Sequence, residues 1–354
     1  MKIKQFIPLI IAAFQLLNNS IIKSQELTHK EQIIQVMIDM NMDTDVEDLG
    51  ALATLHALAD NGEVKILSTT CSTTNNWSAP CISVINNWYK RPKLPVGMLK
   101  AQVNLGSSQQ WPGYSFNRYL VDHFAGRLKS VAKIPDACTL MRKTLASSRG
   151  KIRIIVTGGS VNLRYLLESK PDNFSKLNGH DLIKEKVNFI VMVGGGYPIF
   201  KQEYNFVQDL ESTRKVVLNW PTPIYYCGYQ LGADIKTGQH LNTWCTSLNL
   251  VRIAYQKWDN FFQQRWNPAY QEAPIRPHGS WDQVAVLFAV KGTGKNFKLS
   301  PAGRNFIKSN GTTEWVPYTE GKDYYIQRNA PQKKIAFEIE RLMAQLPGRN
   351  GIDH

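Results

Sequence analysis

Cysteine is scarce in this sequence, with 5 residues in 354. Cys71, Cys81, Cys138, Cys227 and Cys245 form an odd set without C-x-x-C spacing, which argues against zinc sites and dithiol redox sites. A disulfide and burial as free thiols are both compatible with such a set, because cysteine is also among the most buried residue types. The sequence does not decide between them.

Long apolar runs are absent after the start of the chain. The start has a basic segment (residues 1–4) and a short apolar segment (residues 6–17), which is the pattern of a secretory signal. The apolar segment is too short for a typical membrane span, and no later segment reaches the necessary length. We therefore expect a signal peptide over residues 1–25, an exported (periplasmic or secreted) protein and no stable membrane span after cleavage. An uncleaved anchor is the alternative.

Acidic residues are fewer than basic ones: 28 Asp and Glu against 42 Lys and Arg give a formal net charge of +14. The basic residues are dispersed, with no run denser than Lys333-Lys334, and no nucleic-acid-binding motif is present. We interpret the charge as a general property of the surface. Nucleic acid is therefore not an expected partner, a small molecule is favoured, and association into a homo-oligomer stays open.

Apolar segments of strand length alternate with helix-like segments along most of the chain, and each such strand runs into a glycine-rich or polar loop. This pattern is typical of a parallel sheet, and 43% hydrophobic residues can form a sizeable core. We predict a single α/β domain over residues 26–354, with a mainly parallel open sheet and helices on both faces. The expected strands include residues 33–38, 64–70, 152–156, 187–193 and 223–227, and the expected helices residues 79–89, 136–148, 210–219, 248–262 and 280–290.

Other segments carry weaker signals. Residues 101–118 are rich in Gly, Ser, Gln and aromatic residues, which suits a long loop near a site. Asp136 and Ser280 precede helix-like segments and are candidate N-caps. The C-terminal part predicts short strand-like pieces at residues 313–316 and 324–326, followed by an amphipathic helix over residues 334–346.

An acidic loop follows the first expected strand. In open α/β sheets, ligand sites lie at the carboxyl ends of the strands, and this loop begins at such an end. Carboxylates this close repel one another unless a positive charge lies among them, and oxygen ligands of this kind favour calcium. The sequence therefore predicts a Ca²⁺ site here. The polar residues of the loop are Asp39, Asn41, Asp43, Asp45, Glu47 and Asp48.

Two other interpretations of the loop compete. Acidic residues can simply cap a helix and complement its dipole, but that accounts only for Glu47 and Asp48. An EF-hand loop requires Gly at position 6 and Glu at position 12, where this sequence has Thr44 and Gly50. A strand rather than a helix also precedes the loop, so we set the EF-hand aside.

Four motifs, in order along about residues 33–290, resemble the inosine–uridine-preferring nucleoside hydrolase family. The similarity covers most of the chain, and the four together are far more specific than any one alone. The motifs are the acidic loop (residues 39–48), T-G-G-S-V-N (residues 157–162), M-V-G-G-G-Y with E-Y-N (residues 192–197 and 203–205) and S-W-D (residues 280–282).

The resemblance implies hydrolysis of the N-glycosidic bond of a ribonucleoside or similar riboside, through an oxocarbenium-like transition state. It also implies a Ca²⁺ ion that binds two ribose hydroxyls and a water molecule. Transferred by position, the metal set is Asn41, Asp48, the main-chain oxygen of Thr157 and Asp282, with Asp39 supporting the loop from behind. The implied substrate-binding set is Glu47, Asn75, Asn76, Asn162, Glu203, Asn205 and Trp281.

The sequence departs from the family pattern at the residue that acts as the general base. The family has Asp where this chain has Asn41, and an amide cannot accept the proton of water near neutral pH. Asp43, which replaces a family Gly, and Asp45 are the candidate substitutes. Trp281 stands where some members have a His that protonates the leaving base. His56 and His278 are not expected to be ligands.

Three functions follow from these observations. The first is an exported, calcium-assisted nucleoside hydrolase-like enzyme. The second is an impaired relative that binds a nucleoside or sugar without turnover, because Asn41 replaces the base. The third is an interaction protein with a basic, tryptophan-rich surface, in which the acidic loop serves stability alone.

Overall fold

The computed structural model describes residues 33–43, 45–101, 115–124, 126, 128 and 130–348. The expected signal peptide over residues 1–25, Thr44, and residues 102–114 of the expected long loop lie outside these ranges. The contacts divide the chain between Ile33 and Ile34. The fold and the site described below belong to the unit that begins at Ile34.

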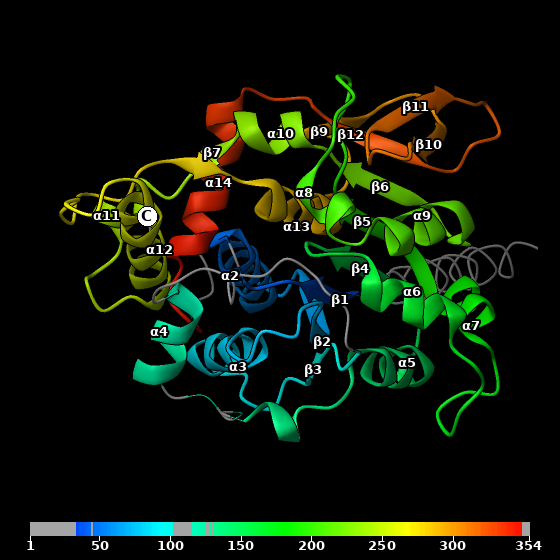
Figure 1. Ribbon diagram of the computed structural model, residues 1–354, viewed down its shortest axis with the longest axis horizontal. Coiled ribbons are helices and arrows are strands. Elements are labelled where there is room, and N and C mark those ends of the chain that lie inside the picture. Colours follow the sequence, from blue (N-terminus) through cyan, green and yellow to red (C-terminus); the bar gives the residue numbers. More distant parts are fainter. Residues whose placement is uncertain are drawn as a thin grey trace, which may run out of the picture. The chain divides into compact units, whose positions relative to one another are not determined.

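A central sheet of eight strands organises this unit (Figure 1). Neighbouring strands pair in parallel, except that β9 is antiparallel to β12. The prediction of a mainly parallel open sheet is therefore confirmed. In spatial order the strands are β3 (Val96–Met98), β2 (Val64–Cys71), β1 (Ile34–Met40), β4 (Ile152–Val156), β5 (Val187–Val193), β6 (Ile224–Cys227), β12 (Tyr324–Arg328) and β9 (Phe297–Leu299).

Helices cover both faces of the sheet, as predicted (Figure 1). Successive strand residues point to opposite faces, so that Ile155 packs into one apolar cluster and Ile154 into the other. One cluster receives α2 (Glu47–Asp60), α3 (Ser78–Trp88), α12 (Leu250–Trp266), α13 (Trp281–Lys291) and α14 (Gln332–Ala344). The other receives α5 (Ala137–Ser147), α6 (Val161–Glu168), α7 (Gly179–Lys186) and α9 (Leu210–Asn219).

Short elements complete the unit. Strand β12 was expected only as an isolated strand-like piece, yet it extends the central sheet beside β6. Pairing with a strand about 100 residues away leaves no local pattern in the sequence, because period-2 alternation reports exposure and not partners.

The remaining elements are α4 (Phe116–His123), α8 (Tyr204–Gln208), α10 (Tyr229–Asp234), α11 (Leu241–Trp244), the ribbon β7 (Lys236–Thr237) with β8 (His278–Gly279), the ribbon β10 (Gly303–Ile307) with β11 (Thr313–Pro317), and the 3₁₀ turn Val131–Lys133.

The two expected helix caps have different outcomes. The Asp136 carboxylate accepts a hydrogen bond from the Thr139 amide at 2.9 Å, so it caps α5 as predicted. Ser280 precedes α13 but makes no side-chain cap. That prediction is wrong because the Ser280 hydroxyl forms a 2.7 Å hydrogen bond with the Thr237 hydroxyl on β7.

All five cysteines are free thiols, and Cys71, Cys81, Cys227 and Cys245 are buried. The structure therefore favours the interpretation of these cysteines as packing residues. In the described part of the chain, no helix combines the length and the apolar character that crossing a membrane requires.

Candidate active site

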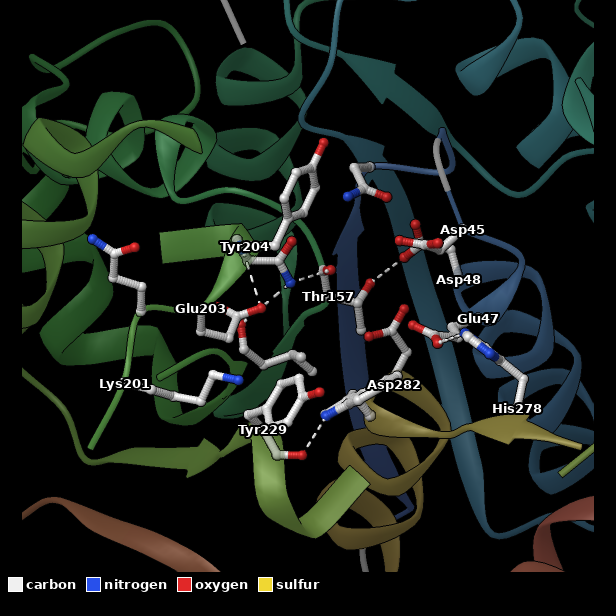
Figure 2. Close-up of a pocket in the computed structure, with 15 residues that line it drawn as sticks. Asp45, Glu47, Asp48, Thr157, Lys201, Glu203, Tyr204, Tyr229, His278 and Asp282 are labelled. Atoms are coloured by element: carbon white, nitrogen blue, oxygen red, sulfur yellow. Dashed lines mark hydrogen bonds and ion pairs between the residues drawn. The ribbon is translucent and has the colours of Figure 1, made fainter. Parts of the chain in front are cut away.

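A pocket of about 250 Å³ opens at the carboxyl ends of β1, β4 and β5, beside the first turn of α13 (Figure 2). This is the edge at which parallel α/β sheets bind ligands, and the volume suits a small molecule better than a macromolecule. The pocket is lined by Asn41, Asp45, Glu47, Asp48, Thr157, Val193, Lys201, Gln202, Glu203, Tyr204, Asn205, Tyr229, His278, Trp281 and Asp282.

Asp48 connects the acidic loop to the neighbouring strand. One carboxylate oxygen accepts a hydrogen bond from the Met42 amide at 2.5 Å, and the other accepts one from the Thr157 hydroxyl at 2.6 Å. The Met42 backbone has φ of 48°, a left-handed conformation that is uncommon for a residue with a side chain. Helix α2 has no side-chain cap at Val46. Asp48 therefore organises the site, and simple helix capping does not account for its position.

Three buried carboxyl groups meet at the base of the pocket: Glu47, Asp48 and Asp282. Burial raises the pKa of Asp48 and that of Glu47. Burial also raises the pKa of Asp282 well above its ordinary value, and the charges of Asp48 and Glu47 raise it further. Buried like charges are unfavourable unless a proton or a cation lies among them. Binding of a cation would return these groups to the charged form.

His278 supplies a positive charge beside this cluster. Its Nε2 atom lies 2.7 Å from Glu47 Oε1 and forms an ion pair with it, although the geometry falls short of an aligned hydrogen bond. Burial lowers the pKa of His278, but the contact with Glu47 and the charge of Asp45 outweigh burial and raise it above the ordinary value. One imidazolium cannot balance the several carboxylates that line the pocket.

The residues present fit a hard divalent cation. Asn41, Asp48, the Thr157 main chain and Asp282 offer oxygen atoms in the same pocket, which is the ligand type that calcium prefers. Within the described ranges, no three His, Cys, Asp or Glu side chains are arranged as a metal-binding group. The expected set differs in composition, since it combines two carboxylates with an amide and a main-chain oxygen.

Glu203 and Asn205 form the opposite wall, where α8 begins. The Glu203 carboxylate accepts hydrogen bonds from the amides of Asn205 at 3.1 Å and Phe206 at 3.2 Å, and burial raises its pKa to about 7. The Asn205 side-chain amide donates to the main-chain oxygen of Thr157 at 3.0 Å. The third motif is thus connected directly to the second.

The structure separates the two candidate substitute bases. Asp45 lines the pocket beside Glu47, whereas Asp43 does not line it and accepts a 2.7 Å hydrogen bond from the Asn75 side chain. Asn75 and Asn76 also lie outside the lining of the described pocket. Among the loop carboxylates, Asp45 is therefore better placed than Asp43 to reach a bound water molecule.

Asp39 and Asn162 lie behind the pocket and not in its lining. The Asp39 carboxylate accepts hydrogen bonds from the Thr70 hydroxyl at 2.6 Å and the Asn162 amide at 2.8 Å. Burial raises the pKa of Asp39 to about 7. Asp39 has the supporting position that the resemblance implies, and Asn162 holds Asp39 here instead of contacting the pocket.

Several lining residues were not predicted as site residues from the sequence. His278 was not expected at the site, and the β7–β8 ribbon brings it there, four residues before Asp282. Lys201, Tyr204 and Tyr229 line the pocket as well. The only local indication in the sequence was the position of His278, two residues before the S-W-D motif.

Two glycines allow the close packing behind the site. A Cβ atom on Gly158 would lie 2.7 Å from the Asn41 amide nitrogen, so a side chain there would displace the acidic loop. A Cβ atom on Gly194 would overlap the Phe206 ring of α8. Close approach of neighbouring atoms therefore requires glycine at both positions.

Solved structures with the same architecture identify the fold. At a TM-score of 0.64, the inosine–uridine-preferring nucleoside hydrolase from Bacillus anthracis is 15% identical, over 88% of this chain and 99% of that one. The chain has the nucleoside hydrolase fold. No family model and no curated protein matches the sequence.

Two effector proteins share this nucleoside hydrolase fold. The effector XOO4466 has a TM-score of 0.69 and 14% identity, over 92% of this chain and 97% of that one. The type III effector XopQ, solved in complex with adenosine diphosphate ribose, has a TM-score of 0.64 and 13% identity, over 92% of this chain and 98% of that one. At sequence identities this low, the structural similarity establishes the fold alone. The chemistry must be argued from the site.

Proposed function

We propose that this protein is a calcium-assisted hydrolase of the N-glycosidic bond of a ribonucleoside or similar riboside. The observation that carries the proposal is the cluster of Glu47, Asp48 and Asp282, buried at the strand ends of a nucleoside hydrolase fold. The nucleoside hydrolase fold supports the hydrolase character, and the calcium, the substrate and the base are the finer steps of the proposal. The XopQ complex supports a ribose-containing small molecule as the partner.

Asn41, Asp48, the Thr157 main-chain oxygen and Asp282 would hold the calcium ion. When bound, the ion offsets the charge of the carboxylates and lowers the pKa of a water molecule beside it. The side chain of Glu47, held by His278 at 2.7 Å, is available to accept a hydrogen bond from a sugar hydroxyl. Glu203 and Asn205 bind the sugar from the opposite wall.

Asp45 is the residue we assign as general base. Its carboxylate removes a proton from water as the water oxygen bonds to the anomeric carbon and the bond from that carbon to the base nitrogen breaks. The ring oxygen shares the positive charge that develops on the sugar, as in glycoside hydrolysis. Tyr229 and Trp281, whose ring centroids are 5.5 Å apart, provide an aromatic wall for the departing base.

The test is release of reducing sugar from nucleosides, measured with calcium and with a chelator. Wild-type protein should need calcium, and Asp45→Asn should lose on the order of a hundred- to ten-thousand-fold in kcat, the usual effect of removing a general base. Asp43→Asn is the matched control, because Asp43 does not line the pocket. A larger loss from Asp43→Asn than from Asp45→Asn would refute the assignment of the base.

A second function is a binding protein without turnover, and Asn41 favours it because an amide stands where the family has its base. It requires that nucleosides bind with calcium but are not hydrolysed by the wild-type protein. Asn41→Asp should then produce hydrolysis.

We also propose that the protein is exported, with residues 1–25 as its signal peptide.

A further inference from the structure

Lys201 provides a positive charge on the pocket wall that faces the carboxylate cluster. In Figure 2 it lies with Glu203, Tyr204 and Tyr229 on one side of the pocket, while Asp45, Glu47, Asp48 and His278 lie on the other. The Lys201 side carries one carboxylate, that of Glu203, whereas the other side carries three beside His278, so an anionic ligand group is repelled less on the Lys201 side. A ligand that fills the pocket should match both sides.

Packing on two sides holds Lys201 at this place. Its Nζ atom lies 3.4 Å from the centroid of the Tyr229 ring, which is a close cation–π contact. Its main-chain oxygen accepts hydrogen bonds from the amide and the hydroxyl of Thr313 at 3.4 Å, which ties the segment to β11. The ammonium group thus lies against the Tyr229 ring, which also lines the pocket.

The ammonium group keeps hydrogen-bonding capacity for a ligand. The Tyr229 ring contacts one side of the Lys201 ammonium group, which has three N–H donors. In the part of the chain that the structure describes, Lys201 forms no ion pair, and its Nζ atom donates no hydrogen bond. A phosphate or carboxylate on the ligand would supply charge-assisted hydrogen bonds to this group.

We propose that the pocket takes ribosides phosphorylated at the 5′ position, with Lys201 binding the phosphate. This rests on the proposed function, in which the carboxylate side of the pocket faces the 2′ and 3′ hydroxyls through calcium. A phosphate at those hydroxyls would meet Glu47 and Asp45 and be repelled. The 5′ hydroxyl is the remaining hydroxyl of the riboside. Lys201 lies two residues before Glu203, and in the proposed function Glu203 binds the sugar from the same wall of the pocket.

The experiment measures dissociation constants of full-length protein in calcium for D-ribose, D-ribose 5-phosphate and inorganic phosphate. None of the three has an N-glycosidic bond, so binding is read without turnover. The variants are Lys201→Ala and Lys201→Arg. Lys143→Ala is the matched control, because Lys143 also lies over an aromatic ring (Phe174, 5.9 Å) but does not line the pocket. Inosine hydrolysis is assayed in parallel.

Ribose 5-phosphate should bind on the order of 10- to 100-fold more tightly than ribose, the range for a hydrogen bond to a charged group. Lys201→Ala should remove that gain, and Lys201→Arg and Lys143→Ala should keep it. Equal binding of the two sugars, or a gain that survives Lys201→Ala, overturns the proposal, and hydrolysis of inosine then leaves the proposed function standing. If neither ribose compound binds and inosine is not hydrolysed, both fail.

A negative charge on the base is the other chemistry that could reach Lys201. Orotidine, which carries a carboxylate on its base, is therefore compared with uridine. A Lys201-dependent preference for orotidine without a preference for ribose 5-phosphate would place the anion on the base and overturn the 5′ assignment.

Discussion

At the scale of single residues, His56 shows how the core constrains a titratable group. It is fully buried in α2 and stacks on Tyr89, with ring centroids 4.6 Å apart. Nε2 lies 2.9 Å from the Asn86 side-chain oxygen, an acceptor, and Nδ1 lies 3.4 Å from the Arg91 guanidinium, a donor. These partners select the neutral ring with its proton on Nε2. Burial, and secondarily the Arg91 charge, lower the pKa of His56 to about 3.

This lowered pKa makes stability depend on pH. Above about 6.5 the ring is neutral in both the folded and the unfolded states. As the pH falls from there towards 3, the unfolded chain takes up a proton that the folded chain refuses, so the free energy of unfolding decreases. Between pH 7 and pH 5 the expected loss from His56 is about 2 kcal/mol. Urea unfolding at the two pH values measures it.

His56→Gln should reduce that pH dependence by about the same amount, whatever its effect at pH 7. His180→Gln, at an exposed position on α7, is the control and should keep the wild-type dependence. Equal pH dependence of wild type and His56→Gln would show that another group controls acid stability.

At the scale of elements, the turn between β4 and α6 fits closely against the acidic loop. A Cβ atom on Gly158 would lie 2.7 Å from the Asn41 nitrogen and would also overlap the Ser72 hydroxyl. Backbone atoms cannot rotate away, so Gly158→Ala must move the loop that carries Asn41 and Asp48. We expect Gly158→Ala to lower the free energy of unfolding by about 1–3 kcal/mol, the range for overpacking, and to weaken calcium binding.

Gly159→Ala is the matched control in the same turn. A Cβ atom there would meet only the Gln208 side-chain oxygen, at 3.2 Å, and that side chain can move. It should cost less than Gly158→Ala in denaturant unfolding. If the two variants were equally unstable, a loss of backbone freedom in the turn, and not contact with the loop, would be the cause.

At the scale of the whole molecule, calcium should be coupled to folding. An ion that binds only the folded chain raises the free energy of unfolding by about 2.7 kcal/mol at a hundred times its Kd, which corresponds to about 5 °C in Tm. Asp282→Asn removes a ligand charge and should abolish most of this rise in calorimetry. In a chelator the same variant should melt no lower than wild type, because it removes one of three buried carboxyl groups.

Asp323→Asn is the control for this measurement. Asp323 is also a buried aspartate, but it precedes β12 and accepts a 3.0 Å hydrogen bond from the first amide of β6, at the opposite edge of the sheet from the site. The variant should melt lower than wild type because it weakens this hydrogen bond, yet it should keep the full response to calcium. A response to calcium that survives Asp282→Asn would remove Asp282 from the ligand set.

Much of the fold was predictable, because its signals are local. Residues 187–193 were expected as a strand and form β5 with the same bounds. The run is mostly apolar, rich in valine and of strand length, which favours a buried strand. The resemblance of the motifs to a known family also predicted that Asp48, Thr157 and Asp282 lie in one site, and all three line the same pocket. The pairing of β12 with β6 was not predictable, because it depends on contacts distant in sequence.

The direction of side chains in the acidic loop could not be derived from the sequence. Met42 adopts a left-handed backbone, so the alternation of a strand does not continue through the loop. As a result, Asp45 lines the pocket and Asp43 binds Asn75, although both are aspartates two residues apart. His278 and Lys201 reach the pocket only because separate elements meet there.

The sequence by itself determined the class of the fold and indicated the strand-end edge of the sheet at which the pocket lies. These follow from apolar periodicity and from the order of the motifs, which are properties of the chain. The tertiary structure alone decided that Asp45 faces the pocket, that His278 pairs with Glu47 and that Lys201 stands opposite the carboxylates. Burial, charge pairing and close packing are relations between distant segments, and they exist only once the chain has folded.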